Sequence, residues 1–151
     1  MRVHRLALML LAPLLGGCAI GLPYQDLSAG RPASGPTRVV ALTYAVLDAD
    51  KRAPFDRASA EVIRSLASQP GIVGYKLRRE ILGDAVWTMT VWESEAARAA
   101  FVGSPVHRAA IQTGSAAVRQ GRFAHVEVPA AEAPLSWKRA LAVLDSAEAR
   151  Y

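Results

Sequence analysis

Four segments of the chain show the period of two that is typical of β-strands. The predicted strands are residues 38–47, 72–82, 85–92 and 122–128. In the first strand both alternating sets of side chains are largely apolar, which indicates that it is covered on both faces. In the third strand Trp87 and Trp92 fall on opposite faces, and neither face is strongly polar. Gly83 and Asp84 separate the second strand from the third and predict a hairpin turn.

The segments between and after these strands carry apolar side chains at helical spacing. The predicted helices are residues 55–68, 95–102, 105 to about 118 and 137–149. Ser94, Ser104 and Ser136 each stand before one of these helices as a favourable N-cap residue. The element order β-α-β-β-α-β followed by a terminal helix predicts an α+β fold of the ferredoxin-like kind, in which helices cover one face of an antiparallel sheet.

This arrangement would leave the other face of the sheet bare, although its strands are apolar on both sides. Because burial of apolar surface is the main favourable term in folding, we expect that face to be covered as well. A second copy of the same sheet, related by a two-fold axis, would cover it and predicts a homodimer with the sheets face to face, a dimeric α/β barrel. The terminal helix at residues 137–149 could cover part of the face instead.

Residues 1–17 show the pattern of a signal peptide. Two arginines precede an apolar run at residues 6–15, which is too short to span a bilayer as a helix. The run is followed by LGGC at residues 15–18, which resembles the lipobox of bacterial lipoproteins. This resemblance implies that Cys18 receives a lipid and becomes the N-terminus, so that the protein is anchored to a membrane of the bacterial cell envelope. An ordinary secretory signal with a chance cysteine is the alternative.

The segment after the signal peptide is rich in proline and glycine and lacks an apolar period. We therefore expect residues 18–37 to be a lipidated cysteine followed by a flexible linker. Ala19 after the cysteine resembles the sorting pattern of outer-membrane lipoproteins, which implies the outer membrane, facing the periplasm. The folded domain is expected over residues 38–128, and residues 129–151 are expected to be a linker and a C-terminal helix.

The composition is that of one globular domain. The chain has 151 residues, of which 52% are hydrophobic and 21% charged, and its formal net charge is +5. Since no basic run is interleaved with aromatic residues, we expect no nucleic-acid binding. A single cysteine cannot form an internal disulfide or a cysteine-based zinc site, and the histidines lack metal-site spacing, so we expect no bound metal.

The stretch TVWESEAARAAFVGSPVHRAAI, residues 90–111, joins a strand end, a Ser-capped helix and a second helix with a histidine. It resembles the region after the third strand in antibiotic-biosynthesis-monooxygenase-like domains of the dimeric α/β-barrel superfamily. The resemblance covers residues 38–128 and implies this fold and a homodimer. It implies less about function, because the superfamily includes cofactor-independent quinone-forming monooxygenases, haem-degrading enzymes and members without an established activity.

The haem-degrading branch of this superfamily shares the strand end at Trp92. Aligned on that residue, its second tryptophan falls at Phe101 and its haem-ligating histidine at Ile111. The asparagine of its first strand has no counterpart in residues 38–47. The resemblance therefore does not carry this mechanism over, and we expect no cofactor. His107 lies one helical turn before Ile111, so haem ligation from a shifted position stays open.

His107 is the strongest candidate for a catalytic residue. It falls on the same side of its predicted helix as Ile111, so its side chain can face the sheet. A histidine in that place could act as a general base towards a phenol, because its ordinary pKa is near 6.5, or as a haem ligand. The alternative is a packing or surface role.

Further residues with rings are candidates for the walls of a ligand pocket, namely Tyr44, Trp87, Trp92, Phe101 and His125. Flat apolar walls suit a small apolar or aromatic ligand. The alternative is that these rings pack in the core and at the dimer interface.

These observations favour an envelope lipoprotein whose domain binds a small apolar or aromatic ligand, without catalysis or with an activity that the residues do not define. The alternative is a monooxygenase, cofactor-free or haem-using, that acts on an aromatic or quinol-like substrate. The sequence shows no Ser-His-Asp arrangement, Gly-rich phosphate loop or pair of catalytic carboxylates that would indicate another class of enzyme.

Overall fold

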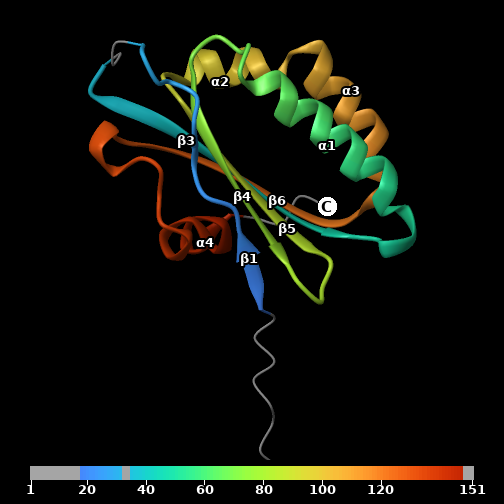
Figure 1. Cartoon of the computed structure of the whole chain (residues 1–151). Helices are drawn as coiled ribbons and strands as arrows, with labels where there is room; N and C mark the ends of the chain where they lie inside the picture. The colour runs from blue at the N-terminus through green and yellow to red at the C-terminus, as the bar shows by residue number, and fades with distance from the viewer. Residues whose placement is uncertain (1–17, 32–34, 148–151) are drawn as a thin grey trace, which may run out of the picture.

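The computed structural model describes residues 18–31 and 35–147 (Figure 1). The predicted signal peptide at residues 1–17 lies outside them. The strands are β1 (Ala19–Gly21), β2 (Gln25–Asp26), β3 (Thr37–Leu47), β4 (Ile72–Glu80), β5 (Ala85–Trp92) and β6 (Val118–Pro129). The helices are α1 (Arg52–Leu66), α2 (Glu95–Val102), α3 (Pro105–Gly114) and α4 (Trp137–Ser146), with short 3-10 turns at Ala49–Lys51, Ser115–Ala117 and Ala130–Glu132. No helix in this part of the chain is both long and apolar enough to span a membrane.

The strands form one antiparallel sheet in the order β1-β4-β5-β3-β6, and β2 also pairs with β4. The order β3-α1-β4-β5-α2-α3-β6-α4 confirms the α+β, ferredoxin-like fold with a C-terminal helix that the sequence predicts. The helices α1, α2 and α3 cover one face of the sheet, and α4 lies on the other face (Figure 1). Each face of the sheet is therefore covered, but by different elements.

On the side of α1 and α2, an apolar core gathers where β5 ends and the chain enters α2. Trp92 is fully buried there and packs with Val39, Leu66, Ile72 and Phe101. Val39 and Trp92 face the same side because they are register partners in the antiparallel pair of β3 and β5. This core fixes the position of α2 relative to the sheet.

On the side of α4, a second apolar core alternates along the same strands with the first. Leu42, Met89 and Val91 pack there against Leu135 and Leu144, and all five are almost fully buried. The sequence analysis assigned the cover of this face to a second copy of the sheet, whereas α4 supplies part of that cover within one chain. Burial of this face therefore does not require a homodimer, and the homodimer stays a prediction.

The flexible linker expected over residues 18–37 is wrong for the part that contains β1 and β2. β1 pairs with β4, and beyond it Leu22 N donates to Leu77 O at 2.9 Å. Tyr24 occupies the space left by the missing side chain of Gly74, and burial raises the pKa of Tyr24 to about 12. The outer edge of β4 would otherwise present unpaired backbone groups, so this segment pairs with it despite its proline and glycine content.

The last strand begins earlier than the sequence predicts. β6 starts at Val118 instead of residue 122 and pairs with β3 along most of its length. α3 accordingly ends at Gly114, short of the expected end near residue 118. Glycine is a weak helix former, and here it lets α3 approach α1 closely, since a Cβ atom at this position would lie 3.3 Å from the ring of Phe55.

Candidate functional site

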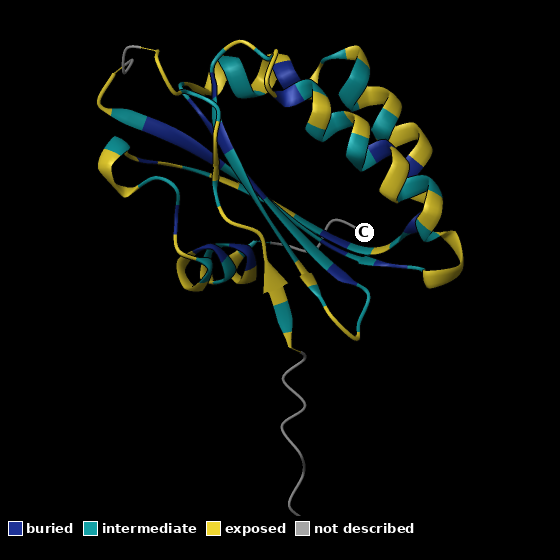
Figure 2. Ribbon diagram, in the orientation of Figure 1, coloured by how far each residue is buried: buried dark blue, intermediate teal, exposed yellow. Residues whose placement is uncertain are grey.

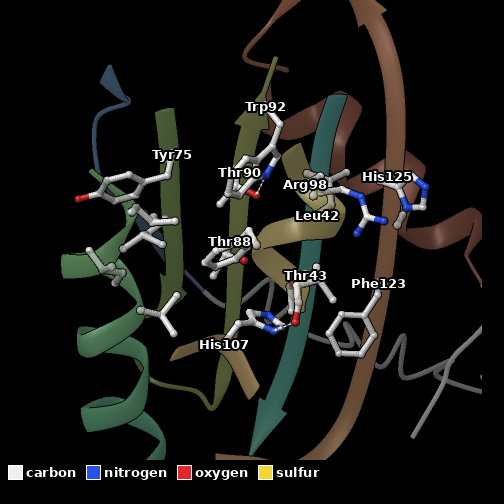
Figure 3. A pocket seen from close by; sticks show the side chains of 18 of the residues that line it. Leu42, Thr43, Tyr75, Thr88, Thr90, Trp92, Arg98, His107, Phe123 and His125 are labelled. Atoms are coloured by element: carbon white, nitrogen blue, oxygen red, sulfur yellow. Dashed lines mark hydrogen bonds between the residues drawn. The ribbon is translucent and has the colours of Figure 1, made fainter. Parts of the chain in front are cut away.

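A cavity of about 430 Å³ lies between the sheet and the helices α1, α2 and α3 (Figure 3). Strands β3, β4, β5 and β6 form its floor, and side chains of the three helices form its roof. Most of the lining is apolar. The polar side chains in it are those of Thr43, Thr88, Thr90, Arg98, His107 and His125. The volume falls within the range of about 300–1,000 Å³ that is typical of small-molecule sites.

Three rings in contact form one wall of this cavity. Trp92 and Phe101 have ring centroids 4.9 Å apart, and Phe101 meets the edge of His107 at the same centroid distance. The indole Nε1 of Trp92 donates to Thr90 Oγ1 at 2.9 Å, so the buried tryptophan has its polar atom satisfied. The wall thus runs from the end of β5 through α2 to the first turn of α3.

The break between α2 and α3 positions His107. α2 ends at Val102, which leaves its carbonyl without a partner in the helix, and Ser104 caps α3 by accepting a hydrogen bond from His107 N. The imidazole Nδ1 of His107 lies 3.1 Å from Val102 O. Because a carbonyl oxygen only accepts, Nδ1 carries the proton, and Nε2 is left as an acceptor.

Burial sets the charge of this imidazole. Desolvation lowers the pKa of His107 below its ordinary value of 6.5, and the hydrogen bond with Val102 O opposes this shift only in part. The ring is therefore neutral at pH 7. A neutral imidazole with a free Nε2 can accept a hydrogen bond or a proton from a molecule in the cavity.

A charged cluster lies at the rim of the cavity beside β6. Arg98 Nε donates to Glu95 Oε2 at 2.8 Å, and His125 Nε2 lies 3.8 Å from the same oxygen. The hydrogen bond from Arg98 lowers the pKa of Glu95, so this carboxylate is charged at neutral pH. The side chain of His125 is 54% exposed, which makes it a rim residue and not part of the apolar wall.

The predicted pocket residues Tyr44 and Trp87 lie on the opposite face of the sheet. Their ring centroids are 5.4 Å apart, and they line a smaller hollow of about 270 Å³ beside α4. Arg122 and Asp145, which also line it, form an ion pair at 3.2 Å. The expectation that all five rings share one pocket is therefore wrong. Side chains alternate between the faces of a strand, and Trp87 and Trp92 stand an odd number of residues apart on β5.

A comparison of the sequence with known families gives one match that covers just over half of the 151 residues. The family described as Antibiotic biosynthesis monooxygenase matches residues 37–113. The chain belongs to the antibiotic biosynthesis monooxygenase family. The matched residues run from β3 into α3, so they include most of the cavity and end before β6. No curated protein sequence matches the chain significantly.

Solved structures of monooxygenase-like proteins share the fold. A candidate antibiotic biosynthesis monooxygenase from Nitrosomonas europaea is 14% identical with a TM-score of 0.57, over 68% of this chain and 97% of that one. A candidate monooxygenase from Lactobacillus acidophilus is 18% identical with a TM-score of 0.56, over 62% of this chain and only 46% of that one. A protein from Shewanella oneidensis is 13% identical with a TM-score of 0.56, over 70% and 97%. At such identities the likeness shows the fold alone.

The structure adds cavity residues that the sequence analysis did not select. Thr88 and Thr90 share the face of Trp92, and the strand period already carried that signal. Arg98 stands three residues before Phe101 on α2, a spacing that places both on one side of a helix. Within residues 18–31 and 35–147, no group of three or more His, Cys, Asp or Glu could hold a metal ion.

Proposed function

We propose that this member of the antibiotic biosynthesis monooxygenase family is an envelope lipoprotein that binds a small apolar or aromatic ligand between the sheet and α1–α3. One observation carries the proposal, which is an apolar cavity of about 430 Å³ with an imidazole in its wall. Small-molecule sites are mainly apolar, with a few polar groups that orient the ligand. The rings of Trp92 and Phe101 favour a flat ligand.

The state of His107 narrows the chemistry of this ligand. Its Nδ1 is engaged with Val102 O, and its neutral Nε2 needs a donor. A hydroxyl group on the ligand would supply that donor, and a phenol combines it with a flat apolar body. We therefore expect phenol-like ligands to bind more tightly than analogues without the hydroxyl proton.

Family membership and the free Nε2 of His107 also favour a second candidate function, a cofactor-free monooxygenase. In this reaction Nε2 takes the proton of a phenolic substrate, and the electron-rich anion passes an electron to O₂. One oxygen atom then ends on the ring, which becomes a quinone, and the other leaves in water. The described residues do not fit the haem-degrading branch, since Ile111 stands where that branch has its ligand, and no step is derived through haem.

Titration with 1-naphthol and its methyl ether tests the proposed ligand site. We expect the protein to bind the naphthol about tenfold more tightly, because the ether cannot donate to Nε2. His107→Phe should abolish this difference and keep binding of the ether, while Tyr44→Phe on the opposite face should change neither affinity. Failure of both compounds to bind the protein would contradict a cavity for flat aromatic ligands.

Oxygen uptake separates the two candidate functions. Uptake with a quinol that is lost in His107→Phe would support the monooxygenase. Binding of the same quinol without uptake would leave a binding protein. A haemin titration completes the comparison, and we expect no Soret band that depends on His107.

The membrane anchor in this proposal is a lipid on the Cys18 thiol. The lipobox-like residues 15–18 support it, and Cys18 is exposed. We place the protein at the outer membrane, facing the periplasm. Mass spectrometry of the chain purified from bacterial membranes should find an acylated N-terminal Cys18, and Cys18→Ser should carry no lipid. An unmodified thiol in the native chain would refute the anchor.

A homodimer is also part of the proposal. Among the described residues β6 pairs with β3 alone, so its outer edge is open to a second copy of the chain. Sedimentation equilibrium should therefore give the mass of a dimer. A monomer over the whole range of concentrations would refute this part of the proposal and leave the cavity untouched.

A further inference from the structure

The large apolar side chains that are exposed in the described structure fall into two groups. Val102, Ile111 and Phe123 line the cavity and belong to the proposed ligand site. The remaining ones lie at another place, and we call them the hairpin patch: Ile20, Leu22, Ile81 and Leu82. Leu82, in the turn between β4 and β5, is 99% exposed, so no described residue covers it. Such a residue is unusual on a soluble surface and indicates a contact outside the domain.

Cys18 lies directly beside this patch. Ile81 N donates to Cys18 O at 2.9 Å, and Ile20 is the register partner of Arg79 on β4. β1 therefore joins the chain after Cys18 to the strand that leads into the turn. Figure 1 shows the start of β1 and the turn between β4 and β5 at the same end of the molecule, and Figure 2 shows exposed residues on both.

This pairing leaves no slack between Cys18 and the folded domain. A flexible linker would let the domain stand away from the bilayer, but β1 begins at the very next residue, Ala19. A lipid on Cys18 therefore brings the turn to the membrane surface. Because apolar side chains gain free energy on leaving water, Ile81 and Leu82 favour a position among the lipids.

The charges around the patch are compatible with a membrane surface. Arg79 is exposed opposite Ile20, where its guanidinium can meet anionic headgroups. Asp84, in the same turn, forms an ion pair with Arg119 at 3.0 Å. Glu80 turns a carboxylate oxygen towards Ala85 N, which donates to it at 3.2 Å. Both acidic side chains of the turn thus have partners within the domain.

From this geometry we propose that the hairpin patch is a membrane-contact surface, with Ile81 and Leu82 inserted into the bilayer that holds the lipid of Cys18. The proposal rests on the lipid anchor proposed above. A protein partner could also bind an apolar turn, but the attachment of the chain at Cys18 favours the bilayer as the occupant.

A polarity-sensitive dye at the turn tests this contact. The full chain carries the dye on Leu82→Cys, with Val102→Cys at the cavity as the matched control, and both are reconstituted in phosphatidylethanolamine–phosphatidylglycerol vesicles. We expect the emission of the dye at position 82 to shift to the blue and to be quenched by brominated acyl chains. The dye at position 102 should keep the spectrum that it has in water.

The mass of each purified chain reports the Cys18 lipid separately. A lipidated chain whose dye at position 82 stays in water would overturn the contact surface and leave the anchor standing. If Cys18 carries no lipid, vesicle binding of the Cys18→Ser chain decides. There, Leu82→Asp should bind about tenfold more weakly than Val102→Asp, because it loses one buried leucine side chain. Equal binding of these two variants would overturn the proposal.

Discussion

The two faces of the sheet are built from the same strands, yet one is filled and the other holds a cavity. Along β5, Met89 and Val91 face α4 and are buried, whereas Thr88 and Thr90 face the cavity. α4 closes its face with one continuous apolar stripe, while the roof of the cavity is divided between α1, α2 and α3. One step along a strand therefore exchanges a packing position for a binding position, because side chains alternate between faces.

The largest expected effect comes from deleting side-chain volume on the filled face. Met89→Ala should lower the free energy of unfolding by about 2–5 kcal/mol, because it leaves a cavity among well-packed residues. Its neighbour Thr88 lines an existing cavity, so Thr88→Ala should cost less than about 1 kcal/mol. Urea unfolding of both variants measures the contrast. Equal losses would show that the two faces are packed alike.

The next effect concerns binding and should be confined to the cavity face. Thr43→Leu adds apolar volume to the lining, so we expect naphthol affinity to fall about tenfold, as overpacking of a fitted site predicts. Tyr44→Phe, at the adjacent position of β3, lies on the face of α4 and should leave the affinity unchanged. A loss in Tyr44→Phe with none in Thr43→Leu would place the ligand on the wrong face for our proposal.

The sequence predicted the fold of the domain because its signals are local. The period of two in β5 and the serine caps before α2, α3 and α4 mark elements that the structure contains at nearly the same residues. β1 and β2 were missed for the opposite reason. Strands of two and three residues show no period, and their formation depends on the free edge of β4, which is far away in the sequence.

The candidate site was predictable only in part. The stretch that joins Trp92, Phe101 and His107 showed where a wall would form, and the structure places these rings in contact. Tyr44 and Trp87 were grouped with them by residue type, although the alternation along the strands separated them. The tautomer of His107 could not be predicted, because it depends on how the helix break turns the carbonyl of α2 towards α3.

A smaller effect concerns pH and should affect the cavity face first. Burial lowers the pKa of His107 below 6.5, so the unfolded chain binds its proton more readily than the folded one. The resulting contribution to stability is present above about pH 6.5 and is lost as the pH falls through the folded pKa. We expect amide exchange in α3 to accelerate at low pH before exchange in α4 does. In His107→Phe this difference between the helices should shrink, and an unchanged difference would contradict the role of His107.

The smallest effect should come from the charges at the rim, and it tests whether they act on the cavity at all. Glu95→Gln removes the carboxylate that holds Arg98, while Glu132→Gln breaks a comparable exposed ion pair with Arg139 beside α4. Exposed ion pairs contribute little to stability, so neither variant should change the urea midpoint measurably. Glu95→Gln should, however, free the guanidinium of Arg98 and raise the affinity for an anionic ligand such as naphthoate by no more than about fivefold. The same gain in Glu132→Gln would show that the effect is one of net charge, and that the rim does not distinguish one face from the other.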